Sequence, residues 1–149
     1  MRKSICALFA TACLCLPLSA VKKVVNPPEF APAAGAPAPM FSPGVLVDGT
    51  LYVSGQIGQD LKTKEVPADF EAEVKQALDN IGIILKAAGM TYKDVVAVQI
   101  YLTDVDLFAK MNGVYSKVFT EPRPSRTTVG VTKLANAKAR IEVTVTARK

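Results

Sequence analysis

The sequence contains no histidine and no tryptophan, and its three cysteines, Cys6, Cys13 and Cys15, all lie close to the N-terminus. The rest of the chain has neither an imidazole nor a thiol, which excludes Ser-His-Asp and Cys-His catalysis and a zinc site built from the usual ligands. No glycine-rich phosphate-binding pattern occurs either. Proton transfer must therefore depend on carboxylate, tyrosine, lysine or ordered water, and we expect no metal site.

Clusters of basic residues are also missing. The 149 residues include 18 lysines and arginines against 13 acidic residues, which gives a net charge of +5, and half of all residues are apolar. Without a basic run or interleaved aromatic residues, this small positive excess gives little support for nucleic-acid binding. The length and composition fit one soluble domain with a single core.

Residues 1–20 have the layout of a secretory signal peptide. A basic start precedes the apolar run from Ile5 to Leu18, and Ala20 offers a small residue before the cut. The apolar run is too short for a good membrane span and is interrupted by Pro17. Cleavage would remove every cysteine and lower the net charge from +5 to +3. We therefore predict an exported protein, located in a bacterial periplasm or secreted.

Cys13 leaves a second possibility open at the N-terminus. It follows Ala10-Thr11-Ala12, which is faintly similar to a bacterial lipoprotein cleavage site although the usual leucine is missing. Lipidation there would anchor the N-terminus to a membrane. Residues 21–43 hold six prolines and almost no helix or strand pattern, so they are predicted to form an extended Pro/Ala-rich linker.

Residues 44–149 have the patterns of an α+β domain. Asp48-Gly49 is a pair typical of a two-residue hairpin turn, and Asp69 and Gly89 are suited to the two ends of a helix. The predicted elements are strands 45–47 and 51–53, a helix over 69–88, a strand over 94–102, a helix beginning at Thr103-Asp104, and strands 126–132 and 140–147. The order is β-β-α-β-α-β-β.

Arg126 is hard to explain as an ordinary surface residue. Pro122 and Pro124 favour an extended backbone before it, and the β-branched run 127–132 follows it. A guanidinium group fixed at the start of a strand can hold a carboxylate through two parallel hydrogen bonds. We predict that Arg126 binds a small organic acid. The alternative is a solvated or ion-paired arginine at a strand end.

Three blocks of sequence carry a family resemblance. They are Tyr52-Val53-Ser54-Gly55-Gln56-Ile57, the helical segment from Glu65-Val66-Pro67-Ala68-Asp69 to Ala87-Ala88-Gly89, and Pro124-Ser125-Arg126 with its strand followed by Ile141-Glu142-Val143. Over about residues 38–147 the chain resembles the Rid family of YjgF-like imine deaminases. The resemblance implies a chorismate-mutase-like α+β fold, with a mostly antiparallel sheet and two helices on one face. It also implies a homotrimer with ligand clefts between subunits.

The resemblance also implies an activity that requires no cofactor. Family members hydrolyse 2-imino and 2-enamino acids to 2-keto acids and ammonium. In this sequence Arg126 would bind the substrate carboxylate, and Glu142 would orient or deprotonate the attacking water. The other residues expected at the cleft are Phe41, Ser54, Gly55, Asn112 and Thr128.

Several of these assignments have a plainer alternative. Gly55 could mark only a β-bulge, Asn112 could face water, and Glu142 could pair with Arg140 or Lys138. The distance between the two catalytic candidates is a further difficulty. If the last two strands formed a tight hairpin, Arg126 and Glu142 would lie about 13 Å apart. The substrate and water would then bridge them, the strands would pair differently, or a neighbouring subunit would complete the cleft.

The sequence departs from the family pattern at three cleft positions. Phe41 replaces a tyrosine, Thr128 replaces a cysteine, and Thr144 replaces a second glutamate. Arg126 and Glu142 remain, so the residues support binding of a small acid more strongly than turnover. The predicted function is imine/enamine deamination, and the alternative is a non-catalytic exported trimer that binds small carboxylates such as 2-keto acids. Ribonuclease or chaperone-like activity gains nothing from the charge distribution.

Overall fold

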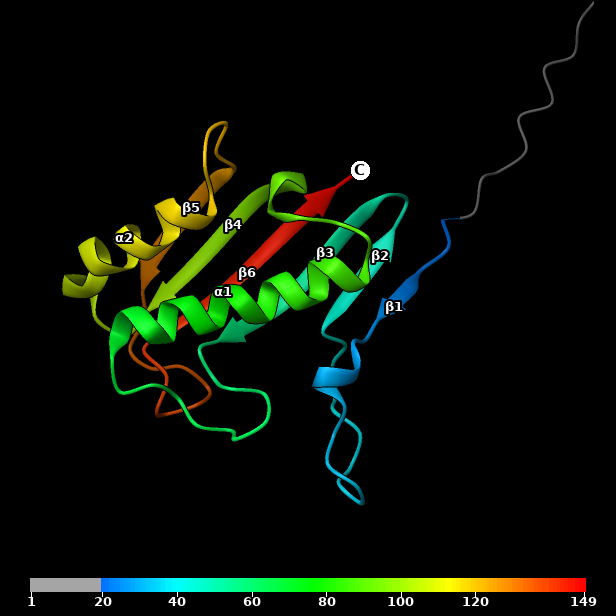
Figure 1. Cartoon of the computed structure of the whole chain (residues 1–149), viewed down its shortest axis with the longest axis horizontal. Coiled ribbons are helices and arrows are strands. Elements are labelled where there is room, and N and C mark those ends of the chain that lie inside the picture. The colour runs from blue at the N-terminus through cyan, green and yellow to red at the C-terminus, as the bar shows by residue number, and fades with distance from the viewer. Residues whose placement is uncertain (1–19) are drawn as a thin grey trace, which may run out of the picture.

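In the computed structural model, which describes residues 20–149, one mixed sheet of six strands has two helices on the same face (Figure 1). The strands are β1 (Lys23–Val25), β2 (Gly44–Val47), β3 (Thr50–Ile57), β4 (Val95–Leu102), β5 (Ser125–Gly130) and β6 (Ile141–Arg148). The helices are α1 (Phe70–Ala87) and α2 (Phe108–Val118). The order in the sheet is β1-β2-β3-β6-β4-β5, and only β4 and β5 pair in parallel. The predicted fold class is confirmed.

Local sequence signals account for the hairpin and the first helix. Asp48 and Gly49 both have positive φ, 47° and 74°, as a two-residue turn between β2 and β3 requires. The side chain of Asp69 accepts a hydrogen bond from the backbone N–H of Ala72, which caps α1 at its predicted start. Both predictions are confirmed.

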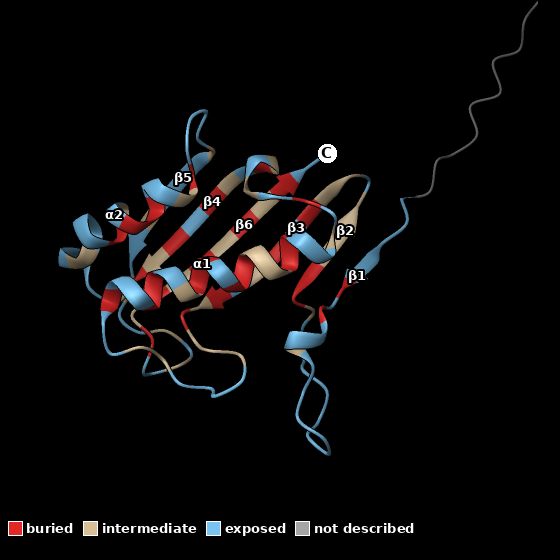
Figure 2. Cartoon of the chain, in the orientation of Figure 1, coloured by how far each residue is buried: buried red, intermediate tan, exposed pale blue. Residues whose placement is uncertain are grey.

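The core lies between the helices and one face of the sheet (Figure 2). Along β6 the buried and half-buried residues alternate, so that Ile141, Val143 and Val145 face the helices. Glu142 and Thr144 consequently face the side of the sheet that carries no helix in the described part of the chain. This alternation decides which side chains can meet at a site.

The N-terminal segment is more ordered than expected. Within 21–43, predicted to lack strands, β1 pairs antiparallel with β2 and buries Val25. Phe30 ends a 3-10 turn and packs against the core. A strand of three residues is too short to show a periodic pattern, and its partner lies about twenty residues away in the sequence. The sheet therefore extends beyond the predicted domain start at residue 44.

The boundaries of several other elements differ from their predicted positions, and β3 continues to Ile57 rather than ending at residue 53. The second helix starts at Phe108 rather than at Thr103, because Asp104 caps a preceding 3-10 turn by accepting a hydrogen bond from Asp106 N. Strand β5 ends at Gly130 rather than at residue 132, and β6 begins at Ile141 rather than at Arg140. These shifts leave the predicted order of elements unchanged.

The last two strands do not form a hairpin. Strand β6 lies between β3 and β4, and β5 lies on the other side of β4. Val98 of β4 is in register with both Arg126 and Val145, whereas Tyr101 is in register with Glu142. The strands therefore pair differently from the tight hairpin. Arg126 and Glu142 are two strands and three residues apart, about 14 Å by standard strand spacings.

The predicted signal peptide, residues 1–20, lies outside the described residues except for Ala20. All three cysteines also lie outside them. Among residues 20–149, no helix is both long enough and apolar enough to span a membrane.

Candidate functional site

The Ser54-Gly55-Gln56 motif forms a bulge in β3. Val53 pairs with Val145 and Gln56 pairs with Val143, so β3 has one more residue than β6 across this interval. The carbonyl groups released from the ladder find nearby donors, because Thr144 Oγ1 donates to Val53 O at 2.7 Å and Gln56 Nε2 donates to Ser54 O at 2.9 Å. These two hydrogen bonds therefore stabilise the bulge, which lies beside Glu142.

Ser54 also fixes the segment that precedes β2. Its hydroxyl donates to Ser42 O at 2.7 Å, and its backbone N–H donates to Pro43 O at 2.9 Å. Phe41, the residue before Ser42, is thereby held at the rim of the hollow above the bulge, with its side chain 63% exposed. Ser54 positions the site by hydrogen bonding, and Phe41 provides an aromatic surface.

Glu142 lies directly over Gly55. A Cβ atom added at Gly55 would overlap Glu142 Oε1, so only glycine leaves room for this carboxylate. No residue within 20–149 forms a hydrogen bond or ion pair with the Glu142 side chain. The alternative pairing with Arg140 or Lys138 is wrong, since Arg140 pairs with Glu73 at 2.7 Å and Lys138 lies 3.6 Å from Glu65. The carboxylate is thus available to a ligand or a water molecule.

Two hollows meet at Glu142 and Gly55. The larger one has a volume of about 490 Å³ and has an apolar wall formed by Phe30, Phe41, Ile57 and Leu61. The smaller one, about 420 Å³, is lined in part by Tyr101, Lys133 and Thr144. Glu142 therefore lies on the boundary between the two hollows. We call this region, with the Ser54-Gly55 bulge, the carboxylate half-site.

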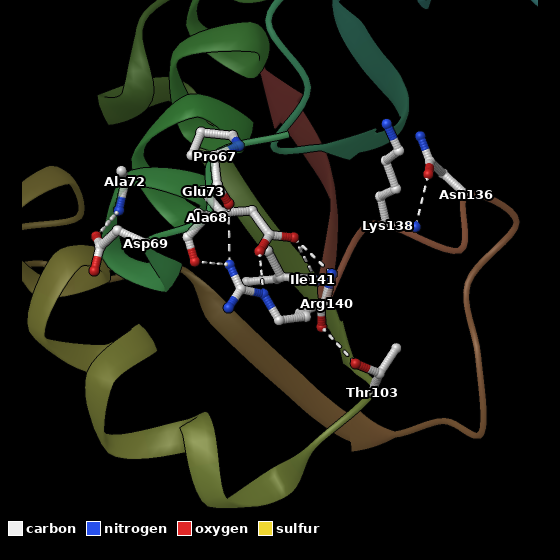
Figure 3. Close-up of polar contacts among 10 residues, drawn as sticks. All are labelled: Pro67, Ala68, Asp69, Ala72, Glu73, Thr103, Asn136, Lys138, Arg140 and Ile141. Carbon is white, nitrogen blue, oxygen red and sulfur yellow. Dashed lines mark hydrogen bonds and ion pairs between the residues drawn. The ribbon is translucent and has the colours of Figure 1, made fainter. Parts of the chain in front are cut away.

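A buried ion pair anchors the carboxylate half-site (Figure 3). Glu73 in the first turn of α1 has no exposed surface. Its Oε1 accepts hydrogen bonds from the backbone N–H groups of Arg140 at 2.6 Å and Ile141 at 3.3 Å, and its Oε2 accepts one from Arg140 Nε at 2.7 Å. Arg140 also donates to the carbonyls of Pro67 and Ala68. Since Glu142 follows Ile141, this pair fixes the start of β6, the strand that carries Glu142.

The sequence reading missed Glu73 and Arg140. A signal was present, because Glu73 falls inside the helical stripe that also contains Phe70, Val74 and Ala77, where a charged residue requires a buried partner. The partner itself lies 67 residues away in the sequence. Helical periodicity can indicate the buried charge, but only the fold identifies Arg140 as its partner.

Arg126 occupies a different environment on β5. Its Nη1 donates a hydrogen bond to Asn112 Oδ1 at 2.8 Å, and its Cζ lies 4.6 Å from the ring centroid of Tyr115 and 5.6 Å from that of Phe108. No carboxylate within residues 20–149 is in ion-pair range of Arg126. Two aromatic rings and an amide thus hold the guanidinium group in place, and the group can still bind an anion. We call these residues the arginine half-site.

Two buried hydroxyl groups in this region have no hydrogen-bond partner within residues 20–149, Thr128 Oγ1 and Tyr115 Oη. Burial raises the pKa of Tyr115, and the positive charges of Arg126 and Arg123 oppose that shift. The phenol therefore stays protonated and can donate. Since buried polar atoms are nearly always paired in folded proteins, both hydroxyls can bond a water molecule or another group near Arg126.

The two half-sites lie on opposite faces of the sheet within one chain. Arg126 contacts α2 on the helix side, whereas Glu142 faces the side without helices. With about 14 Å of sheet between them, no single small substrate can contact both residues of the same chain. The sequence-predicted residues therefore form two groups, one with Phe41, Ser54, Gly55 and Glu142, and the other with Asn112, Arg126 and Thr128.

A helix-backed mixed sheet with a bulged Ser-Gly-Gln strand, a central glutamate strand and an edge strand entered through Pro-x-Arg defines a Rid-type α+β protein. The chain belongs to the family described as endoribonuclease L-PSP, which includes YjgF and RidA, and the family model matches residues 31–149.

Similarity to individual proteins agrees with this membership. The chain is 40% identical over 126 residues to the 2-iminobutanoate/2-iminopropanoate deaminase of Bos taurus, which covers 84% of this chain and 88% of that protein. The structure of the YjgF gene product of E. coli superposes with a TM-score of 0.75 at 36% identity, over 85% of this chain and 98% of the other. E. coli TdcF with bound serine gives 0.75 at 31% identity, with the same coverage.

Proposed function

We propose that this protein hydrolyses 2-imino and 2-enamino acids to 2-keto acids and ammonium. The observation that carries the proposal is the pair of unengaged charges, a guanidinium at Arg126 and a carboxylate at Glu142, which the described residues hold in place but do not neutralise. The deaminase activity named for the Bos taurus relative at 40% identity supports the same reaction. Arg126 is the substrate-binding group, and Glu142 acts on water.

The reaction needs only positioning and one proton acceptor. Arg126 binds the substrate carboxylate and places the imine carbon near Glu142. Glu142 takes a proton from water as the oxygen attacks that carbon, and it passes this proton to the nitrogen as the C=N double bond becomes a single bond. Glu142 then transfers the hydroxyl proton of the carbinolamine to the nitrogen, which leaves as ammonia while the C=O bond forms and takes up a solvent proton to become ammonium. One water molecule is consumed, and no electrons are transferred.

The proposal requires assembly of two half-sites from different subunits. Within one chain Arg126 and Glu142 face opposite sides of the sheet, so a neighbouring subunit must bring its Arg126 to the carboxylate half-site. Apolar side chains remain exposed on the helix-free side of the sheet, among them Tyr52 at 55% and Val129 at 41%, and are available for such a contact. We infer a homotrimer, with Thr128 and Tyr115 of the arginine half-site lining each shared cleft.

A complementation experiment tests the shared site. Arg126→Ala and Glu142→Gln are each expected to abolish ammonium release from an imino acid generated by an amino-acid oxidase. When the two variants are coexpressed with different tags, about a quarter of the interfaces combine an intact Arg126 with an intact Glu142. In a dual-tagged trimer one interface of the three is intact, so activity should return to about a third of that of the unaltered protein in the dual-tagged oligomers. Purified mixed oligomers without recovered activity would contradict a site shared between subunits.

Arg123→Ala is the matched control for loss of a positive charge. Arg123 lies in the same segment but pairs with Glu121 and is separated from the Asn112 contact. We expect it to retain activity. Arg126→Lys should behave like Arg126→Ala, because a single ammonium group cannot make the two parallel hydrogen bonds of the guanidinium.

A second function, binding of small carboxylates without turnover, is favoured by one observation. Thr144 replaces a second glutamate of the family pattern, and its hydroxyl is already engaged with Val53 O. Glu142 is then the only carboxylate that lines either hollow among the described residues. Calorimetry with 2-ketobutyrate separates the two functions. Arg126-dependent binding without any acceleration of imine hydrolysis would establish the carboxylate-binding protein and reject the deaminase.

Export is the last part of the proposal. We propose that residues 1–20 act as a signal sequence and that the reaction takes place outside the cytoplasm. The intact mass and N-terminal sequence of the protein from its native host test this directly. A chain beginning at Val21 supports cleavage, a lipidated Cys13 supports an anchored form, and a chain that retains residues 1–20 contradicts export by a cleaved signal peptide.

A further inference from the structure

The larger hollow beside Glu142 has a chemical character that the proposed reaction does not itself require. Its volume is about 490 Å³, far more than a methyl or ethyl group fills. Phe30, Phe41, Ile57 and Leu61 contribute apolar surface to its wall. The hollow adjoins the carboxylate proposed to act at the imine carbon, so it lies where the side chain on that carbon can extend.

Three of the four side-chain amides at this hollow donate hydrogen bonds within the chain. Asn80 Nδ2 donates to the carbonyls of Ile57 and Gln59 at 3.1 and 2.9 Å, and Gln59 Nε2 donates to Lys64 O at 2.7 Å. Gln56 Nε2 is bonded to Ser54 O. A site whose amide donors are mostly bonded within the chain offers few of them to a polar substrate side chain, while its apolar wall favours an apolar one. Asn136 and Lys64 are the exceptions, and the exposed Lys64 ammonium group can attract an acidic side chain.

The aromatic part of this wall comes from the N-terminal segment. Strand β1 pairs with β2 and holds the segment against the sheet, and Phe30 follows shortly afterwards and reaches the core. The hydrogen bond from Ser54 to Ser42 O fixes the backbone beside Phe41. Phe41 itself is 63% exposed. An exposed aromatic ring at the rim of a hollow gains contact when an apolar group enters.

We propose that the protein selects 2-imino acids with large apolar side chains, aromatic or branched aliphatic, over those with a methyl or ethyl side chain. This selectivity rests on the proposed deaminase function and deepens it. Arg126 of the neighbouring subunit holds the carboxylate, the imine carbon faces Glu142, and the side chain lies in the hollow between Phe41, Ile57 and Leu61.

The test compares imino acids generated by amino-acid oxidases from phenylalanine, leucine, alanine and glutamate. We expect kcat/KM for the phenylalanine and leucine products to exceed that for the alanine product on the order of tenfold, the usual discrimination of an apolar pocket. Equal or faster hydrolysis of the alanine product would overturn the proposal. Preference for the glutamate product would also overturn it and would point to Lys64 as the selective group.

Substitutions at adjacent positions test which residue causes the preference for large apolar side chains. Phe41→Ala should reduce the ratio of phenylalanine-product to alanine-product hydrolysis several-fold, about what a lost apolar contact costs. Met40→Ala is the matched control, because Met40 is 99% exposed and does not line the hollow. Ala135→Phe, which fills the hollow from the opposite loop, should also lower the ratio. A ratio unchanged by both Phe41→Ala and Ala135→Phe would overturn the assignment of the hollow.

Binding of the 2-keto acid products separates failure of the selectivity from failure of the deaminase. If no imino acid is hydrolysed faster with the protein present, the proposed reaction is wrong. Calorimetry with phenylpyruvate and pyruvate then still measures the side-chain preference. Tighter binding of phenylpyruvate that is weakened by Phe41→Ala supports the hollow as a side-chain site, and equal affinity for the two acids rejects it.

Discussion

The two half-sites hold their charged groups by different means. Glu142 belongs to a central strand with a neighbour on each side, and the buried Glu73–Arg140 pair fixes the start of that strand. Arg126 belongs to the edge strand and is held by side chains of one helix, through Asn112 and the ring of Tyr115. Backbone framing gives the carboxylate a fixed place, whereas side-chain contacts give the guanidinium a place that a ligand or a neighbouring chain can adjust.

The difference extends to where each charge is desolvated. Glu73 and part of Arg140 lose their water when the single chain folds, and their hydrogen bonds with each other compensate within that chain. Arg126 is still exposed in the single chain, so it loses its water only when an anion or a neighbouring subunit binds. Stability is therefore concentrated in the carboxylate half-site, and adaptability in the arginine half-site. Substitutions in the two regions should have different consequences.

The largest effect is expected for Glu73→Ala, which removes the anchor of the carboxylate half-site. Arg140 and two backbone N–H groups would lose their acceptor in a buried position, so the free energy of unfolding should fall by about 3–5 kcal/mol. Urea unfolding measures the loss. Glu71→Ala is the matched control, because Glu71 is an exposed acidic residue in the same helical turn and should cost less than about 1 kcal/mol. Similar losses for both variants would show that the anchor contributes nothing specific.

A smaller effect, confined to turnover, is expected for Gly55→Ala. The added Cβ would overlap Glu142 Oε1 and displace the carboxylate from the bulge. The rate of imine hydrolysis should fall on the order of a hundredfold, as for loss of a general base, while 2-ketobutyrate affinity, which depends on Arg126, falls less. Gly113→Ala serves as the control, because no atom lies within 4 Å of a Cβ built at that helical position. Equal losses of rate and affinity would contradict the separation between the half-sites.

The smallest effect is expected for Asn112→Ala in the arginine half-site. It removes one hydrogen bond to the guanidinium but leaves Arg126 stacked on Tyr115. Affinity for 2-ketobutyrate should weaken by about 1 kcal/mol, roughly fivefold, without a change in the free energy of unfolding. Ser116→Ala, an exposed substitution on the same helix, should change neither quantity. A loss of affinity as complete as that of Arg126→Ala would instead make Asn112 indispensable for placing the arginine.

Local chemistry made much of the fold predictable. The hairpin turn requires positive φ at two consecutive residues, for which Asp48-Gly49 is suited, and α1 begins where Asp69 can cap it. Contacts between distant parts of the chain were not predictable in this way. Strand β1 is too short to show a pattern, and the partner of Glu73 depends on how the sheet is ordered.

The candidate site divides along the same line. Arg126 and Glu142 can be recognised as candidates from their residue types and sequence contexts alone. Their separation could not be predicted, because it depends on the insertion of β6 between β3 and β4. Alternation along each strand then places the two side chains on opposite faces. A sequence pattern can therefore name both charged groups without revealing that one chain cannot bring them together.

The central position of β6 also affects how the protein is made. The last eight-residue strand of the chain is a middle strand of the sheet, so β3 and β4 have no partner between them until translation of residues 141–148 is complete. The six-stranded sheet can therefore close only after this strand has left the ribosome, and the contacts of the strands made earlier stay incomplete until then. A chain that stops before residue 141 would thus lack the centre of the sheet rather than its edge.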